Sequence, residues 1–479
     1  MIVIALALAL ALVGLIAIGA LPAVFGLVAI TIVAAVVYWT VRDRAQNILL
    51  VFVSVFLALI VVNGPTPRLS DPKGLERLQQ LWNRGAFDDR LPVVLHLVFD
   101  EMMSPGAIAE DLPGAVPARQ SLYALGERYG LRTYDSVYSR AYFSGVSIPN
   151  LFNAEYRGKM GVSDRFPKLL EQTPQNAYFD DMKARGYRTI VFQTSHLDFC
   201  GNPSVDMCET FPSFDPRVIQ SNARPDLRAR ATHVLSVLLR SYEPSYVSLY
   251  GRRLMTGSER DENAVRTGTE ERFDVQGFPA WFDRFVGFVE TVPRGSHVFA
   301  HFMVPHAPYF LNAECGSTTD GGAGYYLGDR FPGATERAEA RRRSYASYLA
   351  QLQCVSSRIG IFLEAVARNP ELRDARLIIH GDHGSRISAG QLIGDHGRDD
   401  YISNYATYFA VRAPGVAPGL DCRLLSLAEA FRERAAASPS PIDRPTPPVL
   451  VQSAAGSDAV VEAPMPTFGC AERGTHHEK

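Results

Sequence analysis

The sequence predicts an α/β domain, a mostly parallel central sheet with helices on both faces, preceded by an N-terminal transmembrane anchor. From Leu91 onward, short apolar runs alternate with longer stretches of helical periodicity. This alternation is typical of parallel strands joined by helices. Before Leu91 the chain contains apolar stretches of the length that membrane helices need.

The first 64 residues are predicted to form three transmembrane helices. No charged side chain occurs in residues 1–41, and one straight helix of that length would reach about 60 Å, twice a bilayer core of about 30 Å. A turn at the Gly-Ala-Leu-Pro stretch 19–22 therefore divides it. The predicted spans are 2–19, 22–40 and 48–63.

The loop between the second and third predicted spans sets their orientation. Arg42 and Arg44 favour the cytoplasmic side, which places everything after the third span outside the cell membrane. A cleaved signal peptide is the alternative for the first span, but the basic segment such peptides carry is absent. Residues 65–90 form a connector with an amphipathic helix that packs on the membrane or on the domain. The expected location is a bacterial-type inner membrane, with a catalytic domain over 91–479 on the periplasmic or extracellular side.

The strands and helices of this domain follow from their residue patterns. Residues 93–99 and 377–380 are apolar runs rich in Val, Leu and Ile, and the second is followed by glycine. With them, the predicted strands are 93–99, 189–193, 298–304, 377–380 and 405–412. The predicted helices are 118–129, 178–185, 280–292 and 342–368.

The cysteines indicate the compartment of the domain, and the net charge limits its possible partners. All six cysteines follow the third predicted span, and an even number on an exported domain indicates disulfides, although six buried free thiols are the alternative. Cys200 and Cys208 are close enough in sequence to close one loop, and Cys422 with Cys470 would tie the C-terminal tail to the domain. The net charge of -2 and the absence of a basic block exclude nucleic acid as a partner.

A repeated tetrapeptide indicates a metal site. Gly381-Asp382-His383-Gly384 directly follows the apolar run 377–380, and Gly394-Asp395-His396-Gly397 repeats it. Ligands of open α/β sheets bind beyond the carboxyl ends of the strands, and Asp and His are ordinary ligands of zinc or manganese. Two glycine-rich turns that happen to contain His are the alternative interpretation.

Three other clusters lie at predicted strand ends. Asp100-Glu101 follows the first strand and offers oxygen ligands, or alternatively a helix N-terminal charge. The segment 139–149 contains Ser144, and Ser147 with Pro149 there is typical of a helix start. His301 and His306 flank the end of the third strand.

Together these clusters resemble the alkaline phosphatase and sulfatase superfamily, and within it the membrane-anchored branch of phosphoethanolamine transferases and lipoteichoic acid synthases. The resemblance covers roughly 91–415 and includes the order of the clusters. Ser144-Gly145-Val146-Ser147-Ile148-Pro149 matches the spacing of a transferase pattern of the kind Thr-Ala-x-Ser-Val-Pro. Pro305-His306-Ala307-Pro308 resembles the His-x-Pro loop of the family.

The resemblance implies roles for particular residues. Ser144 is the nucleophile and Ser147 a helix-start residue. A divalent ion, zinc or manganese with magnesium or calcium as alternatives, is held by Asp100, Ser144, Asp382 and His383, and Glu101 is the alternative carboxylate ligand. His306 and His396 hold phosphoryl oxygens or protonate the leaving oxygen. Because no strand precedes the second tetrapeptide, Asp395 is interpreted as a turn residue that orients His396. Arg386, Tyr325 and Tyr326 contact the head group.

Two departures from the family patterns narrow the expected activity. Sulfatases convert a Cys or Ser in a Cys/Ser-x-Pro/Ala-x-Arg context to formylglycine, and the residues after Ser144 lack both the Pro/Ala and the Arg. The transferases usually have four or five spans and a disulfide beside the nucleophile, whereas this chain has three predicted spans and no cysteine near Ser144. The first departure disfavours sulfate ester hydrolysis, and the second leaves the donor lipid open.

The predicted activity is transfer of a phospho-head group, phosphoglycerol or phosphoethanolamine, through a Ser144 phosphoenzyme. The donor is a membrane lipid, because a tether raises the effective concentration of membrane substrates. The acceptor is an envelope glycan or lipid. A phosphodiester or sulfate ester hydrolase using the same site is the near alternative, and a non-catalytic envelope protein of the same fold is the more distant one.

Overall fold

The structure is a computed structural model that describes residues 87–153, 171–172, 176–194, 197–211, 270–307, 309–318, 334–387, 397–433, 446–452 and 460–470. The predicted spans within 1–64 and most of the connector 65–90 lie outside these residues. Among the helices that are described, none combines the length and the apolar character needed to cross a membrane.

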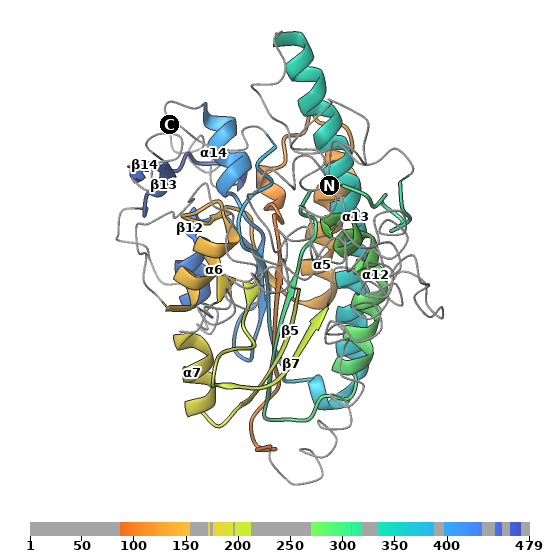
Figure 1. The fold of residues 1–479 in the computed structure, drawn as a ribbon, viewed down its shortest axis with the longest axis vertical. Helices are drawn as coiled ribbons and strands as arrows, with labels where there is room; N and C mark the ends of the chain where they lie inside the picture. The colour runs from red at the N-terminus through yellow and green to blue at the C-terminus, as the bar shows by residue number, and fades with distance from the viewer. Residues whose placement is uncertain are drawn as a thin grey trace, which may run out of the picture. The chain divides into compact units, whose positions relative to one another are not determined.

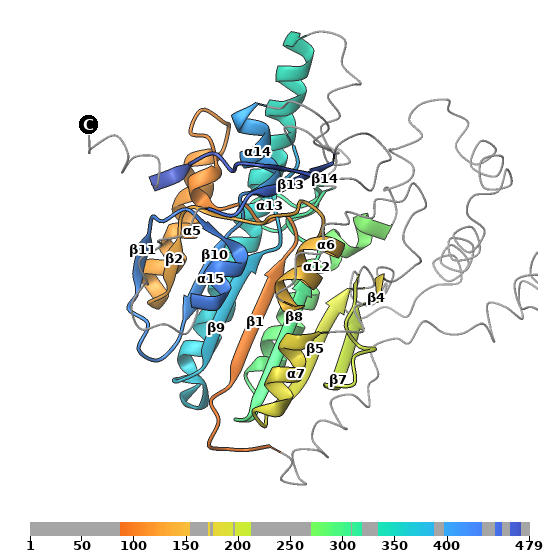
Figure 2. The same ribbon diagram turned by 90° about the vertical axis from the view of Figure 1, so that its left-hand side faces the viewer.

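The described residues form an eight-stranded, mostly parallel sheet, as predicted (Figure 2). The central strand β1 pairs in parallel with β8 on one side and β9 on the other. Only β10 runs antiparallel to its neighbours β9 and β2 within this sheet. In spatial order the strands are β11 (Gly419–Asp421), β2 (Arg132–Tyr134), β10 (Phe409–Arg412), β9 (Arg376–Gly381), β1 (Val94–Phe99), β8 (Ser296–Phe302), β5 (Arg188–Thr194) and β7 (Val205–Phe211).

Helices cover both faces of the sheet, and the residue alternation of β1 explains why. Leu95, Leu97 and Phe99 belong to one buried cluster and Val94 and Val98 to another, because successive side chains of a strand point to opposite faces. One face carries α5 (Ala115–Tyr129), α12 (Glu270–Val289) and α13 (Ala334–Arg368), and the other carries α6 (Ser144–Asn153), α7 (Ala177–Ala184) and α15 (Leu427–Glu433) (Figure 1).

Smaller elements lie around this core. A third buried cluster joins α14 (Arg398–Tyr405), β3 (Val137–Tyr138) and β13 (Val449–Gln452). In both views α14 and the pair β13–β14 lie at the same end of the domain (Figures 1 and 2). The remaining short elements are β4 (Glu171–Gln172), β6 (Leu197–Asp198), β12 (Leu425–Ser426), β14 (Val460–Ala463) and the 3-10 helices at Pro105–Ala107 and Pro370–Leu372.

The strands and helices predicted within the described residues are present, but several begin elsewhere. The helices predicted for 280–292 and 342–368 begin earlier, at Glu270 and Ala334. The strand predicted for 405–412 starts only at Phe409, because Tyr405 ends α14, whose first turn is fixed by a hydrogen bond from Gly397 N to Asp400 Oδ2 of 3.1 Å. The helix predicted to start at Ser147 begins at Ser144, since Phe143 O already accepts from the N–H groups of Val146 and Ser147. Pro149 therefore lies inside this helix and not in its first turn.

All six cysteines form disulfides, so the alternative of six free thiols is wrong. The pairs Cys200–Cys208 and Cys422–Cys470 are those that the sequence suggested. The third bridge, Cys315–Cys354, joins the segment after His306 to α13.

Candidate active site

The carboxylates of the candidate site leave the sheet at adjacent strand ends. Phe99 and Gly381 are register partners of the parallel strands β1 and β9, so Asp100 and Asp382 follow at the same edge. Gly381 lets the backbone of the segment after β1 lie close to the end of β9, because a Cβ at residue 381 would lie 2.3 Å from the carbonyl oxygen of Met102. Both carboxylates are fully buried.

Ser144 lies beside these two carboxylates at the first residue of α6. Its hydroxyl donates to Asp100 Oδ2 at 3.0 Å and lies 3.4 Å from His383 Nε2. His383 Nε2 is also 3.4 Å from Asp382 Oδ2 and 3.7 Å from Asp100 Oδ1. Asp100, Ser144, Asp382 and His383 thus meet, and we call this group the serine cluster.

Hydrogen bonds from neighbouring residues hold the serine cluster in place. Ser147 Oγ donates to Asp382 O at 2.6 Å and lies 2.9 Å from Ser139 Oγ, so the residues on both sides of Ser144 are linked to the residue that follows β9. Asp382 Oδ1 accepts from the backbone N–H groups of Glu101 and His383 at 3.0 and 2.9 Å. One oxygen of Asp382 is therefore fully engaged in orienting the carboxylate.

The other carboxylate oxygens fit a cation. Among the described residues, Asp100 Oδ1 and Asp382 Oδ2 are buried and have no hydrogen-bond partner. Buried acceptors without donors cost free energy unless a cation or water satisfies them. Asp100, His301 and Asp382 can also bring one ligand atom each within 4.8 Å of one another. This donor set of carboxylates and imidazoles suits zinc or manganese.

The charges of the serine cluster also favour a cation. Burial, together with the charges of Asp382 and Glu101, raises the pKa of Asp100 well above its ordinary value. Burial acts in the same direction on Asp382, but His383 and His301 outweigh it and lower the pKa of that carboxyl. The two acids therefore repel each other in the absence of a cation.

Glu101 belongs to a second group beside the first. Its Oε1 accepts from Arg386 Nε at 2.7 Å and from Arg386 Nη2, and its Oε2 accepts from Ala307 N at 3.4 Å. Arg386 Nη2 lies 3.1 Å from His306 Nε2. Burial raises the pKa of Glu101 to about 7, although Arg386 opposes this shift. We call Glu101, Arg386 and His306 the arginine cluster.

The arginine cluster is built on strained backbone and supported by α13. Glu101 and Arg386 have φ values of 61° and 56°, in the left-handed region that costs free energy for residues with a Cβ. Tyr348 of α13 donates to Glu101 O at 2.7 Å. Gln351, one turn further along, donates to the carbonyls of Pro305 and His306 at 3.1 and 3.0 Å. The helix therefore holds both loops that meet at Arg386.

Sequence comparison identifies the family. The sequence model of the Sulfatase family matches residues 92–433. The chain belongs to the sulfatase family. It is thus an enzyme of the alkaline phosphatase and sulfatase superfamily, a hydrolase or a transferase, and that superfamily depends on metal ions. No curated protein matches the chain.

Several solved structures are similar to this sulfatase-family chain. Phosphonate monoester hydrolase of Agrobacterium radiobacter is 14% identical, with 71% of this chain and 72% of that chain covered and a TM-score of 0.41. The C-terminal periplasmic domain of EcEptC from Escherichia coli is 12% identical, with 79% and 93% covered and a TM-score of 0.37. BT1596, a 2-O GAG sulfatase, is 14% identical, with 74% and 72% covered and a TM-score of 0.41.

The structure brings together the predicted site residues that it describes. Asp100, Ser144, Asp382 and His383 meet in one cluster, and Glu101, His306 and Arg386 in the neighbouring one. Tyr325, Tyr326, Asp395 and His396 lie outside the described residues. His301 had no ligand role in the sequence prediction, although its place in an apolar strand pointed to a buried imidazole.

Proposed function

We propose that this protein is a membrane-anchored, metal-dependent phosphotransferase that moves a phospho-head group from a lipid to an envelope glycan or lipid through Ser144. The observation that carries the proposal is the contact of the Ser144 hydroxyl with Asp100 and His383, beside two buried carboxylate oxygens that have no donor among the described residues. Asp100, Asp382 and His383 would hold the ion, with Ser144 completing the set and Glu101 as the alternative carboxylate.

A bound divalent cation would supply the positive charge that lowers the pKa of the serine hydroxyl. Ser144 Oγ forms the new bond to phosphorus while the bond from phosphorus to the lipid glycerol oxygen breaks. The proton lost by Ser144 balances the one gained by the leaving oxygen. An acceptor hydroxyl then takes the group from Ser144 in the same way.

The protein offers two features for the phosphoryl oxygens. Ser144 begins α6, and the N-terminal end of a helix favours negative charge. The guanidinium of Arg386 lies in the neighbouring cluster, 5.5 Å from the centre of the Phe143 ring, next in sequence to Ser144. In the proposal, Arg386 and His306 contact the phosphate or its head group, and Tyr325 and His396 contribute from outside the described residues.

The lipid donor and the exported location rest on the chain outside the sheet. The uncharged stretch 1–41 would tether the enzyme to the membrane and so raise the effective concentration of lipid substrates. The three disulfides favour an oxidising compartment, such as the periplasm. Phosphoethanolamine and phosphoglycerol are the head groups we expect.

The test compares Ser144→Ala with Ser147→Ala in the full-length protein, purified in detergent and supplied with phosphatidylethanolamine or phosphatidylglycerol. We expect Ser144→Ala to lower diacylglycerol release by about a thousandfold or more. Ser147→Ala removes only the hydrogen bonds to Asp382 O and Ser139 Oγ, which position the loop, and should keep measurable turnover. In wild-type protein quenched during turnover, mass spectrometry of the peptide containing Ser144 should show an added phospho-head group, whose mass identifies the donor.

The outcomes separate the alternatives. Full turnover by Ser144→Ala, or a label on another residue, would overturn the proposal. Release of the head group to water in the presence of envelope glycans and lipids would indicate a phosphodiester hydrolase. Preferential cleavage of sulfate esters would indicate a sulfatase, for which the sequence after Ser144 lacks the family context.

A further inference from the structure

The C-terminal segment contacts the loop that carries Ser144. We call residues 446–452 and 460–470 the strap; they include the antiparallel pair β13–β14. The strap begins after residue 433, where the family match ends. It is therefore an addition to the part of the chain that the family model describes, and its contacts need an explanation of their own.

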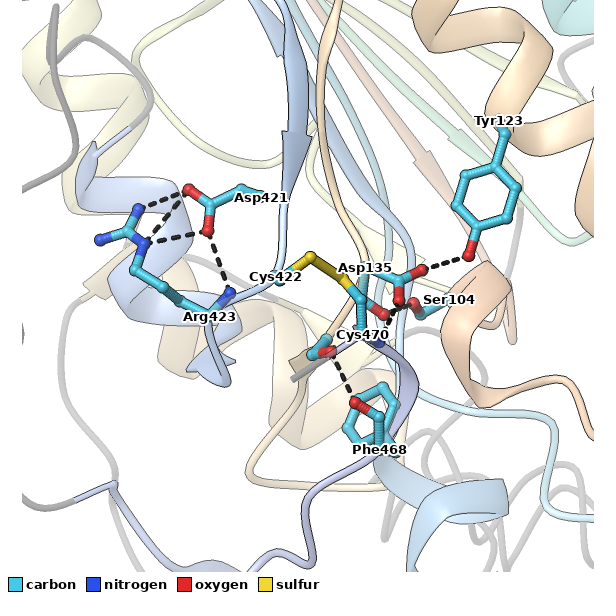
Figure 3. The surroundings of a disulfide bond; sticks show 9 residues. Ser104, Tyr123, Asp135, Asp421, Cys422, Arg423, Phe468 and Cys470 are labelled. Atoms are coloured by element: carbon cyan, nitrogen blue, oxygen red, sulfur yellow. Dashed lines mark hydrogen bonds and ion pairs between the residues drawn. A yellow bond between two sulfur atoms is a disulfide. The ribbon is translucent and has the colours of Figure 1, made fainter. Parts of the chain in front are cut away.

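One end of the strap is fixed by a disulfide and a buried carboxylate (Figure 3). Cys470 is bonded to Cys422, and its N–H donates to Asp135 Oδ2 at 2.6 Å. The other oxygen of Asp135 accepts from Tyr123 of α5 at 2.6 Å. Ser136 Oγ donates to Phe468 O at 2.8 Å. The end of the strap is thus attached to residues 135 and 136, at the beginning of the segment that leads to Ser144.

Gly469 makes this close attachment possible. Its φ is +61°, and an added Cβ would lie 2.5 Å from Asp135 Oδ2 and 3.0 Å from the Cα of Gly106. A residue with a Cβ would meet both strain and a clash at this position. The backbone of the strap therefore approaches Asp135 as closely as only glycine permits.

The other end of the strap is bonded to residues just before the nucleophile. Arg140 Nε donates to Pro448 O at 2.7 Å, and Arg140 O accepts from Leu450 N at 2.8 Å. Tyr138 donates from its hydroxyl to Pro447 O. Arg140 Nη2 also lies 3.1 Å from Glu462 Oε1, but the exposure of Glu462 makes that ion pair weak. Arg140 therefore binds both β13 and β14.

Apolar packing continues from these bonds to the residues on either side of Ser144. Tyr142 is buried in the third core cluster with Val449, Met465 and Phe468 of the strap, and Phe143 and Val146 pack against that cluster. Ser139, next to Arg140, donates from its N–H to Tyr405 O and lies 2.9 Å from Ser147 Oγ. The residues on both sides of Ser144 are thus held by contacts that lead back to the strap.

We propose that the strap, acting through Arg140, is a positioning element that holds Ser144 Oγ against the Asp100–His383 pair. The inference rests on the proposed function, because it takes Ser144 as the nucleophile. Arg140 does not touch the reacting atoms in this proposal. Asp100 and Asp382 are placed by β1 and β9, so these ion ligands keep their positions when the strap is loosened, and only Ser144, which completes the set, moves.

The test is Arg140→Ala in the full-length protein, with Arg188→Ala as the matched control. Arg188 also makes a partly buried ion pair, 2.9 Å to Asp206, but at the β5–β7 edge. We expect Arg140→Ala to lower kcat by about tenfold to a hundredfold, as small misplacements of reacting groups do. KM and the affinity for manganese should stay within about threefold of wild type. Arg188→Ala should leave all three unchanged.

Hydrogen exchange gives a readout that does not depend on catalysis. In Arg140→Ala the backbone amides of residues 138–147 should exchange faster, while those of β1 and β9 keep their wild-type rates. The pair Cys422→Ser with Cys470→Ser should give the same pattern, and the pair Cys200→Ser with Cys208→Ser should not. Arg140→Lys, which keeps the charge and one donor, should recover part of the kcat.

The outcomes distinguish failure of the positioning role of the strap from failure of the proposed function. Unchanged exchange in residues 138–147, or an equal loss of manganese affinity and kcat, would overturn the positioning role. If the wild-type protein turns over no phosphodiester, the proposed function fails, and the exchange rates still decide whether the strap orders the loop. Arg140→Ala could also unfold at 25 °C. If it does, and residues 138–147 of the Cys422→Ser/Cys470→Ser variant exchange at the wild-type rates, the positioning role of the strap is rejected.

Discussion

Two neighbouring carboxylates at the end of β1 lie in different surroundings although both are fully buried. Glu101 receives donors on both oxygens, from Arg386 and Ala307. Asp100 receives one hydrogen bond from the neutral hydroxyl of Ser144, and its Oδ1 has no hydrogen-bond partner among the described residues. Burial alone therefore does not distinguish a cation ligand from a structural acid. The distinction lies in whether the protein itself compensates the charge.

The two clusters consequently differ in whether their negative charge is compensated by the protein. The serine cluster has more acceptors than donors and fits a cation, whereas the arginine cluster already contains its own cation. Glu101 lies close enough to Asp100 and His306 to share an ion with them. Its pairing with Arg386 instead leads us to expect that Glu101 orients the guanidinium toward substrate.

The largest expected difference between Asp100 and Glu101 is in their contribution to metal affinity. We expect Asp100→Asn to weaken zinc or manganese binding by about a hundredfold or more, because groups that merely orient a ligand are already worth about 10- to 100-fold. Glu101→Gln should cost less than about tenfold. Isothermal titration of the ion-free protein measures both.

The ion-free stability of the same variants provides the control. Asp100→Asn should raise the Tm of the ion-free protein, because it removes one of the buried charges that repel each other. A lower Tm would mean that the loss of affinity reflects misfolding. Equal losses of affinity in Asp100→Asn and Glu101→Gln would show that the two clusters form one ion site.

A smaller effect is expected on folding when the arginine cluster is broken. Arg386→Ala leaves Glu101 buried without its ion partner, which should lower the free energy of unfolding by about 3–5 kcal/mol. Adding Glu101→Gln should recover most of this loss. Urea unfolding of the ion-free protein in detergent measures the cycle.

A surface ion pair serves as the reference for this cycle. Arg185 pairs with Asp181 at 2.8 Å, and both side chains are exposed. Arg185→Ala should change the free energy of unfolding by less than about 1 kcal/mol. A similar small change in Arg386→Ala would contradict the view that Glu101 depends on Arg386 for its charge.

The sequence predicted the central strands because those strands are apolar on both faces. Residues 93–99 and 377–380 are such runs, and β1 and β9 are buried throughout their lengths apart from Arg376. The strand β7 was missed because Asp206 and Glu209 interrupt its pattern, as is tolerated at the edge of a sheet. The strand β2 has three residues, too few to show a period.

The serine cluster was predictable because each of its groups follows a strand or begins a helix. The arginine cluster was harder to predict from the sequence, because its contacts join residues that are far apart in the chain. Arg386 and Glu101 are 285 residues apart, and no local pattern shows that one compensates the other. The resemblance to a family supplied a general role for Arg386, whereas only the structure shows its partner.

The smallest effect concerns the support of Glu101 by α13. Tyr348 donates to Glu101 O and accepts from Met103 N at 2.9 Å, so Tyr348→Phe leaves two buried backbone groups unsatisfied and should cost about 1–3 kcal/mol of unfolding free energy. Tyr345, one turn earlier, donates to Ser403 Oγ, which also lies 3.2 Å from Ser385 Oγ. Tyr345→Phe should therefore cost less in the same urea unfolding measurement. Equal costs would mean that the Glu101 backbone does not depend on Tyr348, and the arginine cluster would then owe its position to the Arg386 pair alone.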